Sequence, residues 1–228
     1  VPTRFLQQVF ARHDMPAHTI PNVVDVTTFR PAEPRLSTVA TAPHLVVTRN
    51  LEQLYGNDIA LRALARVRQQ LPGARLSIAG SGPERAALER LADELGLNDA
   101  VRFTGRLETA DIVKLYQSAD LVLNPSRADN TPNSVLEALA CGVPVVSTNV
   151  GGIDAASVEL TRLIDAIGER PLALGCVLRD RGWLNFRDGN PDRVLSTLLL
   201  AKVLIPGYSS DPTGWPIEEI DDGNDYED

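Results

Sequence analysis

The chain has 228 residues, of which 43% are hydrophobic and 23% are charged, an ordinary composition for a protein that buries a core. Its net charge is −8, but eight of the 30 acidic residues lie in residues 206–228, and the other 22 match the 22 Lys and Arg. Residues 1–205 therefore carry no net charge. This argues against nucleic acid as a partner, because nucleic-acid binding calls for a basic patch.

Signals for targeting and for cysteine chemistry are missing from the sequence. No secretory segment opens the chain, and no apolar run approaches the length of a membrane span. Cys141 and Cys176 have neither metal-ligand spacing nor a disulfide framework, and Cys141 lies among small residues that predict a buried free thiol. These observations predict a cytoplasmic protein.

Strands and helices are predicted to alternate after an N-terminal helix at residues 1–13 and a Pro/Asn-containing connector at residues 19–29. Apolar strands are predicted at residues 44–48, 75–80, 101–104, 119–123 and 143–147. Helices are predicted at residues 58–70, 83–95 and 109–119, and from about Ser134. Near-continuous apolar strands alternating with helices are typical of a parallel sheet covered on both faces, so the predicted fold class is α/β with a doubly wound parallel sheet.

The helix predicted at residues 109–119 has one apolar face. Core packing is a sufficient explanation for the four residues of this face: Ile112, Val113, Leu115 and Tyr116.

Polar residues and glycines gather where the predicted strands end. Arg49 follows the first strand, Gly80 and Gly82 follow the second, and Asp129 lies in the loop after the fourth. Ligands of open parallel sheets bind at the carboxyl ends of strands, and a helix start offers backbone amides to a phosphate. Gly80-Ser-Gly82 lacks the third glycine of the dinucleotide fingerprint, so NAD is the poorer interpretation.

The run from Asn124 to Thr148 contains Asp129 and Glu137 with seven residues between them, then a small-residue helix and Gly-Val-Pro-Val-Val. It resembles the donor-binding signature of the retaining GT-B glycosyltransferases of family 4. The connector Ile-Pro-Asn-Val-Val-Asp resembles the family's entry into its second Rossmann-like domain, with Val23 where glycine is common. The resemblance covers about residues 1–153 and implies the Rossmann-like donor-binding half of a GT-B fold.

The resemblance also implies roles for individual residues. Arg49 would contact the donor diphosphate and stabilise its departure, and Asp129, in place of the commoner Glu, would contact the transferred sugar; these are the two predicted catalytic residues. Glu137 would accept hydrogen bonds from the ribose hydroxyls. The other predicted donor-binding residues allow close backbone approach or supply polar groups: Gly80, Gly82, Gly105, Arg106, Asn130, Thr131, Asn133 and Ser134.

Several of these positions have ordinary structural explanations that stay open. Asp129 suits a turn in Asp-Asn-Thr-Pro, Ser134 suits a helix N-cap, and Glu137 suits a helix-face carboxylate at an ordinary position. Tyr55 stands where the family usually has a lysine, so one cation of the diphosphate site is missing.

The implied function is transfer of a sugar from a nucleotide-diphosphate donor to a hydroxyl acceptor on a glycan or lipid, with retention of configuration. No metal or other cofactor is expected, in keeping with the missing Asp-x-Asp motif. The acceptor half would come from a separate polypeptide, or the chain is truncated or a remnant; through such a missing domain it could associate with the inner face of the membrane. A non-catalytic nucleotide-sugar-binding module and a GT-B-like nucleotide-sugar epimerase are the two alternatives.

The resemblance stops after Ile153, and the rest of the chain is interpreted from pattern alone. Helices are predicted at residues 158–167 and 191–204, and short strands at residues 176–178 and 183–186. Residues 1–205 are therefore predicted to form the donor-binding domain, with a divergent helical C-terminal segment. Residues 206–228 are rich in Pro, Gly and acidic residues and predict a disordered tail.

Overall fold

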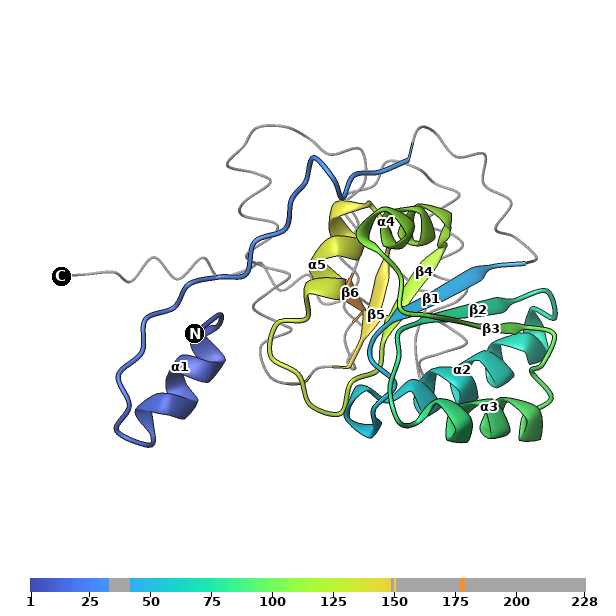
Figure 1. The fold of residues 1–228 in the computed structure, drawn as a ribbon, viewed down its shortest axis with the longest axis horizontal. Coiled ribbons are helices and arrows are strands. Elements are labelled where there is room, and N and C mark those ends of the chain that lie inside the picture. The colour runs from blue at the N-terminus through green and yellow to red at the C-terminus, as the bar shows by residue number, and fades with distance from the viewer. Residues whose placement is uncertain (33–41, 149, 151–176, 179–228) are drawn as a thin grey trace, which may run out of the picture.

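In the part of the chain that the structure describes, six parallel strands form one sheet with helices on both of its faces (Figure 1). The computed structural model describes residues 1–32, 42–148, 150 and 177–178. The strand order is β3-β2-β1-β4-β5-β6, which confirms the predicted doubly wound α/β fold class. The predicted helices at residues 158–167 and 191–204, the strand at residues 183–186 and the tail at residues 206–228 lie outside the described residues.

The elements follow the predicted positions closely. The strands are β1 (His44–Thr48), β2 (Arg75–Ala79), β3 (Val101–Gly105), β4 (Leu121–Asn124), β5 (Val145–Ser147) and β6 (Val177–Leu178). The helices are α1 (Arg4–Ala11), the 3-10 helix η1 (Gln53–Tyr55), α2 (Asn57–Gln70), α3 (Arg85–Glu94), α4 (Thr109–Ser118) and α5 (Asn133–Ala140). Strand β6 falls within one of the two predicted short strands and pairs with β5.

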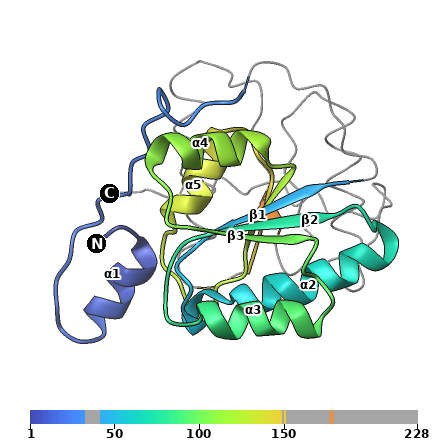
Figure 2. The ribbon, with the colours of Figure 1, turned by 45° about the vertical axis from the view of Figure 1, so that its right-hand side comes forward.

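Strand β1 lies at the centre of the sheet, and its residues alternate between two cores. Leu45 and Val47 pack in the core that contains the apolar faces of α2 and α3, whereas Val46 packs in the core that contains those of α4 and α5. Figure 2 shows α2 and α3 on one side of the sheet and α4 and α5 on the other. Each fully buried Leu or Val contributes roughly 1.5–3 kcal/mol relative to exposure, so the two cores hold the strands in register.

Two strands begin two residues later than the apolar runs predicted. The amide of Ala119 donates to the Tyr116 carbonyl at 2.9 Å and so completes the end of α4. The amide of Val143 donates to the Ala138 carbonyl at 3.0 Å, which closes α5 in a Schellman-type ending. Both predicted strand starts were wrong. Apolar residues that close a helix cannot be distinguished in the sequence from apolar residues that begin a strand.

The N-terminal segment, residues 1–32, lies beside the sheet rather than in it (Figure 1). Helix α1 begins after Thr3, whose Oγ1 accepts from the Leu6 amide at 3.2 Å, and none of its residues is buried. The connector then leads to Phe29, which is only 9% exposed and packs in the core of α4 and α5. The segment is therefore anchored at its C-terminal end by an aromatic core residue.

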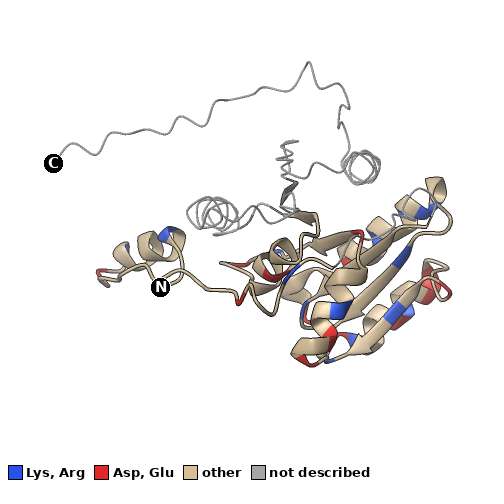
Figure 3. Ribbon diagram, turned by 90° about the horizontal axis from the view of Figure 1, so that it is seen from above, with Lys and Arg blue, Asp and Glu red and all other residues tan. Residues whose placement is uncertain are grey.

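The charged residues of the described ribbon are mixed in sign. Figure 3 shows Lys and Arg interspersed with Asp and Glu over the helices and strands. Among the helices that the structure describes, none is long and apolar enough to cross a lipid bilayer.

Candidate functional site

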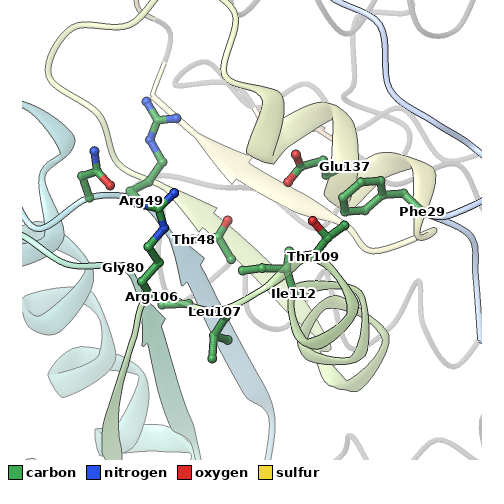
Figure 4. Close-up of a pocket in the computed structure, with 11 residues that line it drawn as sticks. Phe29, Thr48, Arg49, Gly80, Arg106, Leu107, Thr109, Ile112 and Glu137 are labelled. Carbon is green, nitrogen blue, oxygen red and sulfur yellow. The ribbon is translucent and has the colours of Figure 1, made fainter.

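A pocket of about 200 Å³ opens where β1, β2 and β3 end (Figure 4). Strands β1 and β4 are neighbours in the sheet although they are not consecutive in the chain, so the loops after them diverge at this edge. Such a switch point is where open α/β sheets bind ligands. The pocket brings together four of the residues predicted from the sequence: Arg49, Gly80, Arg106 and Glu137.

The other predicted residues lie outside the pocket lining. Most of them lie in the loop between β4 and α5 or at the start of α5: Asp129, Asn130, Thr131, Asn133 and Ser134. Gly82 and Gly105 also contribute no lining atoms. The lining residues that sequence reasoning did not predict are Phe29, Thr48, Asn50, Ala79, Leu107, Thr109 and Ile112.

Arg49 connects the pocket to the loop after β4. Its guanidinium forms an ion pair with Asp129, and its Nη1 lies 3.4 Å from Oγ of Ser134. It also lies over the ring of Tyr55, 4.2 Å from the ring centroid. Tyr55, which stands where the resembled family has a lysine, thus supplies a cation–π contact that fixes the arginine instead of a second positive charge.

Asp129 is oriented by three donors. Besides Arg49, the Ser126 hydroxyl donates to Oδ2 at 3.1 Å, and the Asn130 amide donates to Oδ1 at 2.8 Å. The side chain is only 12% exposed, so its carboxylate is held rather than free to rotate. The Asn130 amide, one of the backbone groups predicted for the donor, is engaged by this carboxylate.

Ser134 does not cap α5, although its position suited an N-cap. The helix begins at Asn133, Pro132 is the N-cap residue, and no side chain caps the helix start. The Ser134 hydroxyl instead accepts from Arg49. Because the first turn starts one residue earlier than predicted, Ser134 lies inside it.

Glu137 is half-buried and hydrogen-bonded on one side. Tyr116 donates from its hydroxyl to Oε2 at 3.1 Å, and Thr48 Oγ1 lies 2.7 Å from the same hydroxyl. Burial raises the pKa of the Glu137 carboxyl, and the hydrogen bond from Tyr116 opposes that rise. The Glu137 side chain points into the pocket, so this helix-face carboxylate lies at the edge of a cavity (Figure 4).

Cys141, the C-cap residue of α5, is a buried free thiol, as predicted. Burial, together with the charge of Glu137, raises the pKa of Cys141 to about 12. The thiol therefore stays protonated at neutral pH and packs as a small apolar side chain.

Gly80 and Gly82 have a packing role that is visible without a ligand. A Cβ atom on Gly80 would lie 2.1 Å from the Arg49 carbonyl oxygen, and one on Gly82 would lie 2.4 Å from the Leu51 carbonyl oxygen. The two glycines let the chain after β2 pass against the backbone of the loop after β1, which carries Arg49. Their contact with a donor remains a prediction.

The N-terminal segment holds the loop between β4 and α5 from outside, which the sequence did not indicate. The Thr3 hydroxyl donates to Oδ1 of Asn130. Nδ2 of Asn22 donates to the Thr131 carbonyl at 3.1 Å and to Oδ1 of Asn133 at 2.8 Å. Three of the predicted donor-binding residues are thus tied to residues more than 100 positions earlier in the chain.

Within the described ranges, no group of three or more His, Cys, Asp or Glu side chains is arranged to hold a metal ion. The ionisable side chains that line the pocket are Arg49, Arg106 and Glu137. Two cations and one carboxylate suit a ligand that carries both negative charge and hydroxyl groups.

Comparison with known proteins identifies the class of protein to which this site belongs. Residues 33–159, more than half of the chain, match the family described as Glycosyl transferases group 1. The structure of Anabaena HepE in complex with UDP and glucose is similar, with a TM-score of 0.57 and 26% sequence identity over 65% of this chain and 43% of that one. The fold is therefore one Rossmann-like half of a GT-B glycosyltransferase, and the chain belongs to the group 1 glycosyltransferase family.

Two curated relatives are similar over most of the chain. The D-inositol 3-phosphate glycosyltransferase of Segniliparus rotundus is 32% identical over 160 residues, which are 66% of this chain and 36% of the relative. The GDP-mannose-dependent monoacylated alpha-(1-6)-phosphatidylinositol monomannoside mannosyltransferase of Corynebacterium glutamicum is 32% identical over 176 residues, 71% of this chain and 45% of the relative. The chain thus matches less than half the length of either relative.

Proposed function

We propose that this chain binds the nucleotide-diphosphate sugar of a glycosyl transfer reaction and, with an acceptor domain, transfers the sugar with retention of configuration. The observation that carries the proposal is the placement of Arg49 and Glu137 on two sides of one pocket at the switch point of the sheet (Figure 4). A guanidinium is suited to a diphosphate, and a carboxylate is suited to the vicinal hydroxyls of a ribose. The related proteins, whose names specify glycosyl transfer and GDP-mannose, support the same reaction class.

The size of the pocket indicates which part of the donor it would hold. Sites for whole small-molecule ligands occupy roughly 300–1,000 Å³, whereas this pocket measures about 200 Å³. We assign it to the ribose and the diphosphate, between Glu137 and the pair of Arg49 and Arg106. The transferred sugar would then lie outside it, toward Asp129, which is 12% exposed beside Arg49.

In the proposed reaction the bond between the sugar and the diphosphate breaks, and a bond to the acceptor oxygen forms on the same face of the sugar. The acceptor proton passes to the departing phosphate oxygen. Arg49 would stabilise the negative charge that develops on the diphosphate, the usual electrostatic task at a leaving group. Asp129 would hold Arg49 in place and contact the sugar hydroxyls.

Binding can be tested by isothermal titration of the chain with UDP-glucose, GDP-mannose and ADP-glucose. We expect one of these donors to bind, and Glu137→Ala and Arg49→Ala each to weaken its binding roughly tenfold or more, since each removes a charged hydrogen-bond partner. Arg68→Ala is the matched control: Arg68 pairs with Asp99 at 3.0 Å and bonds the Ala74 carbonyl, outside the pocket. The proposal fails if none of the donors binds, or if Glu137→Ala binds as tightly as the native chain.

A non-catalytic binding module is the second candidate, because Tyr55 replaces a cation at the diphosphate site. Measuring turnover with an acceptor domain added in trans separates the two functions. Sugar transfer, with the anomeric configuration of the product followed by NMR, would support the enzyme; donor binding without turnover would support the module. The epimerase alternative has less support, because in the described part of the chain Glu137 is the one carboxyl that lines the pocket and an epimerase needs an acid–base pair.

A further inference from the structure

The Tyr116 hydroxyl is a polar group inside an apolar core. The side chain of Tyr116 is fully buried among the residues of α4, α5 and β4, and its ring lies 6.4 Å from that of Phe29. Core packing explains the ring but not the hydroxyl, because burying a hydroxyl is costly unless it is hydrogen-bonded. Its partners therefore indicate what the oxygen does.

The hydroxyl joins three elements that converge at the pocket. It lies 2.7 Å from Thr48 Oγ1 at the end of β1, 3.1 Å from the Ser134 carbonyl in the first turn of α5, and 3.1 Å from Oε2 of Glu137 one turn later. Thr48 and Glu137 both line the pocket, whereas Tyr116 lies behind it. Tyr116 is thus a bridge between two walls of the site.

A tyrosine hydroxyl has one proton, and here two acceptors compete for it. If Thr48 donates to the tyrosine oxygen, the tyrosine proton is available to either the Ser134 carbonyl or the Glu137 carboxylate. A charged acceptor forms the stronger hydrogen bond, so the ionised Glu137 receives the proton. Among the described residues, Oε1 of Glu137 has no hydrogen-bond donor, so one carboxylate oxygen is held and the other is left for a ligand.

We propose that Tyr116, itself oriented by Thr48, is a positioning residue that holds the Glu137 carboxylate so that its second oxygen can bind the donor ribose. The proposal deepens the proposed function and rests on it. Tyr116 acts on the ligand only through Glu137 and does not touch it. The hydrogen bond also favours the ionised form of Glu137, because it opposes the rise in pKa that burial causes.

The groups around Glu137 are few enough for the effect to be isolated. Tyr116 interacts with it from α4 and Cys141 from the C-cap of α5, and the pKa of each is raised by burial and by the charge of Glu137. Arg49 and Arg106 line the same pocket from the loops after β1 and β3. Removing the tyrosine hydroxyl alone leaves these other groups unchanged.

The test is Tyr116→Phe, which keeps the ring and removes the hydroxyl. The carboxyl carbon of Glu137 is followed by NMR against pH in the free chain, and UDP binding is measured by isothermal titration over the same pH range. We expect the pKa of Glu137 to rise in the variant and UDP to bind roughly tenfold more weakly, as for a lost hydrogen bond to a charged group. As the pH is lowered, UDP binding should weaken at a higher pH in the variant than in the native chain, because Glu137 takes up its proton at a higher pH.

Two further variants separate positioning from stability. Thr48→Val leaves Tyr116 intact but removes its partner, and should shift the Glu137 titration in the same direction by a smaller amount. Ser77→Ala removes another buried hydroxyl, which lies 2.8 Å from Nε2 of His44 at a distance from the pocket, and should leave the titration unchanged. If Tyr116→Phe does not fold, Thr48→Val carries the test.

The outcomes of the two proposals are distinguishable. A Glu137 titration that is the same in the native chain, Tyr116→Phe and Thr48→Val would overturn the role of Tyr116, whatever the chain binds. Unchanged UDP affinity in both variants would also overturn it. A third outcome is that the native chain binds neither UDP nor a nucleotide sugar while the Glu137 titration shifts as expected. This outcome would overturn the proposed function, and with it the claim that Tyr116 orients Glu137 toward a ribose.

Discussion

Gly80→Ala is expected to be among the most damaging single-methyl substitutions in this chain. Gly80 has a φ of +152°, a conformation that residues with a Cβ atom rarely adopt, and the added Cβ would lie 2.1 Å from the Arg49 carbonyl oxygen. Ordinary contact begins at 3.4 Å, so the backbone after β1 would have to move by about 1.3 Å. Because the obstructing atom is backbone, a change of side-chain rotamer cannot relieve the clash.

The expected cost has two parts. A backbone conformation open mainly to glycine costs roughly 1–3 kcal/mol, and overpacking against fixed atoms adds about 1–3 kcal/mol. We therefore expect a loss of roughly 4 kcal/mol, a large share of the 5–15 kcal/mol that stabilises a typical domain. Donor affinity should fall as well, since the displaced backbone carries Arg49.

Gly96→Ala is the matched control. Gly96 has a φ of +67°, but a Cβ atom there would have no neighbour within 4 Å. Its substitution should therefore cost only the conformational part, about 1–2 kcal/mol. In thermal unfolding the midpoint of Gly80→Ala should lie roughly 5–10 °C below that of Gly96→Ala. Equal midpoints would refute the close approach of the two loops.

Two further predictions concern ionisable residues. Glu137→Gln should leave the protein at least as stable at neutral pH, because burial raises the pKa of Glu137 and disfavours its ionised form; any gain should shrink as the pH falls through that folded pKa, where the native side chain is also neutral. Urea unfolding at neutral and acidic pH checks this, and a clear loss of stability at neutral pH would contradict it. Arg127→Ala should cost no more than about 1 kcal/mol, because its pair with Asp58, at 2.9 and 2.7 Å, is partly exposed. The Arg127 hydrogen bond lowers the pKa of Asp58 in the folded protein. The loss of stability should therefore be present above the unfolded pKa of 3.8 and disappear as the pH falls through the folded pKa. A loss that persists in acid or in high salt would contradict this prediction.

The local pattern of apolar residues in the sequence was sufficient to predict most of the helices and strands. Strand β1 occupies the five residues expected from its apolar run, and the other helices and strands lie within a few residues of their predicted positions. The errors fall where a hydrogen bond outside the strand determines where the strand begins. At Val143, for example, the amide closes α5 and does not start β5. Periodicity does not distinguish those two uses of an apolar residue.

The site was predicted less completely than the fold. Arg49 and Glu137 could be recognised because each lies in a local motif at the end of a strand or the start of a helix. The contacts that orient them join residues far apart in the chain: Arg49 with Asp129, and Tyr116 with Glu137. Tyr116 was correctly expected in the core, but no spacing rule indicates where a buried hydroxyl finds its partner.

The ties between the N-terminal segment and the loop after β4 bear on how this family can be recombined. A chimaera that joined a foreign N-terminal half at residue 42, immediately before the first strand, would keep every strand of the sheet. It would nevertheless exchange Thr3 and Asn22, and with them the bonds to Asn130, Thr131 and Asn133. It would also exchange Phe29, one of the residues that line the pocket. A crossover point that keeps these contacts therefore lies before Thr3 rather than at the start of the sheet.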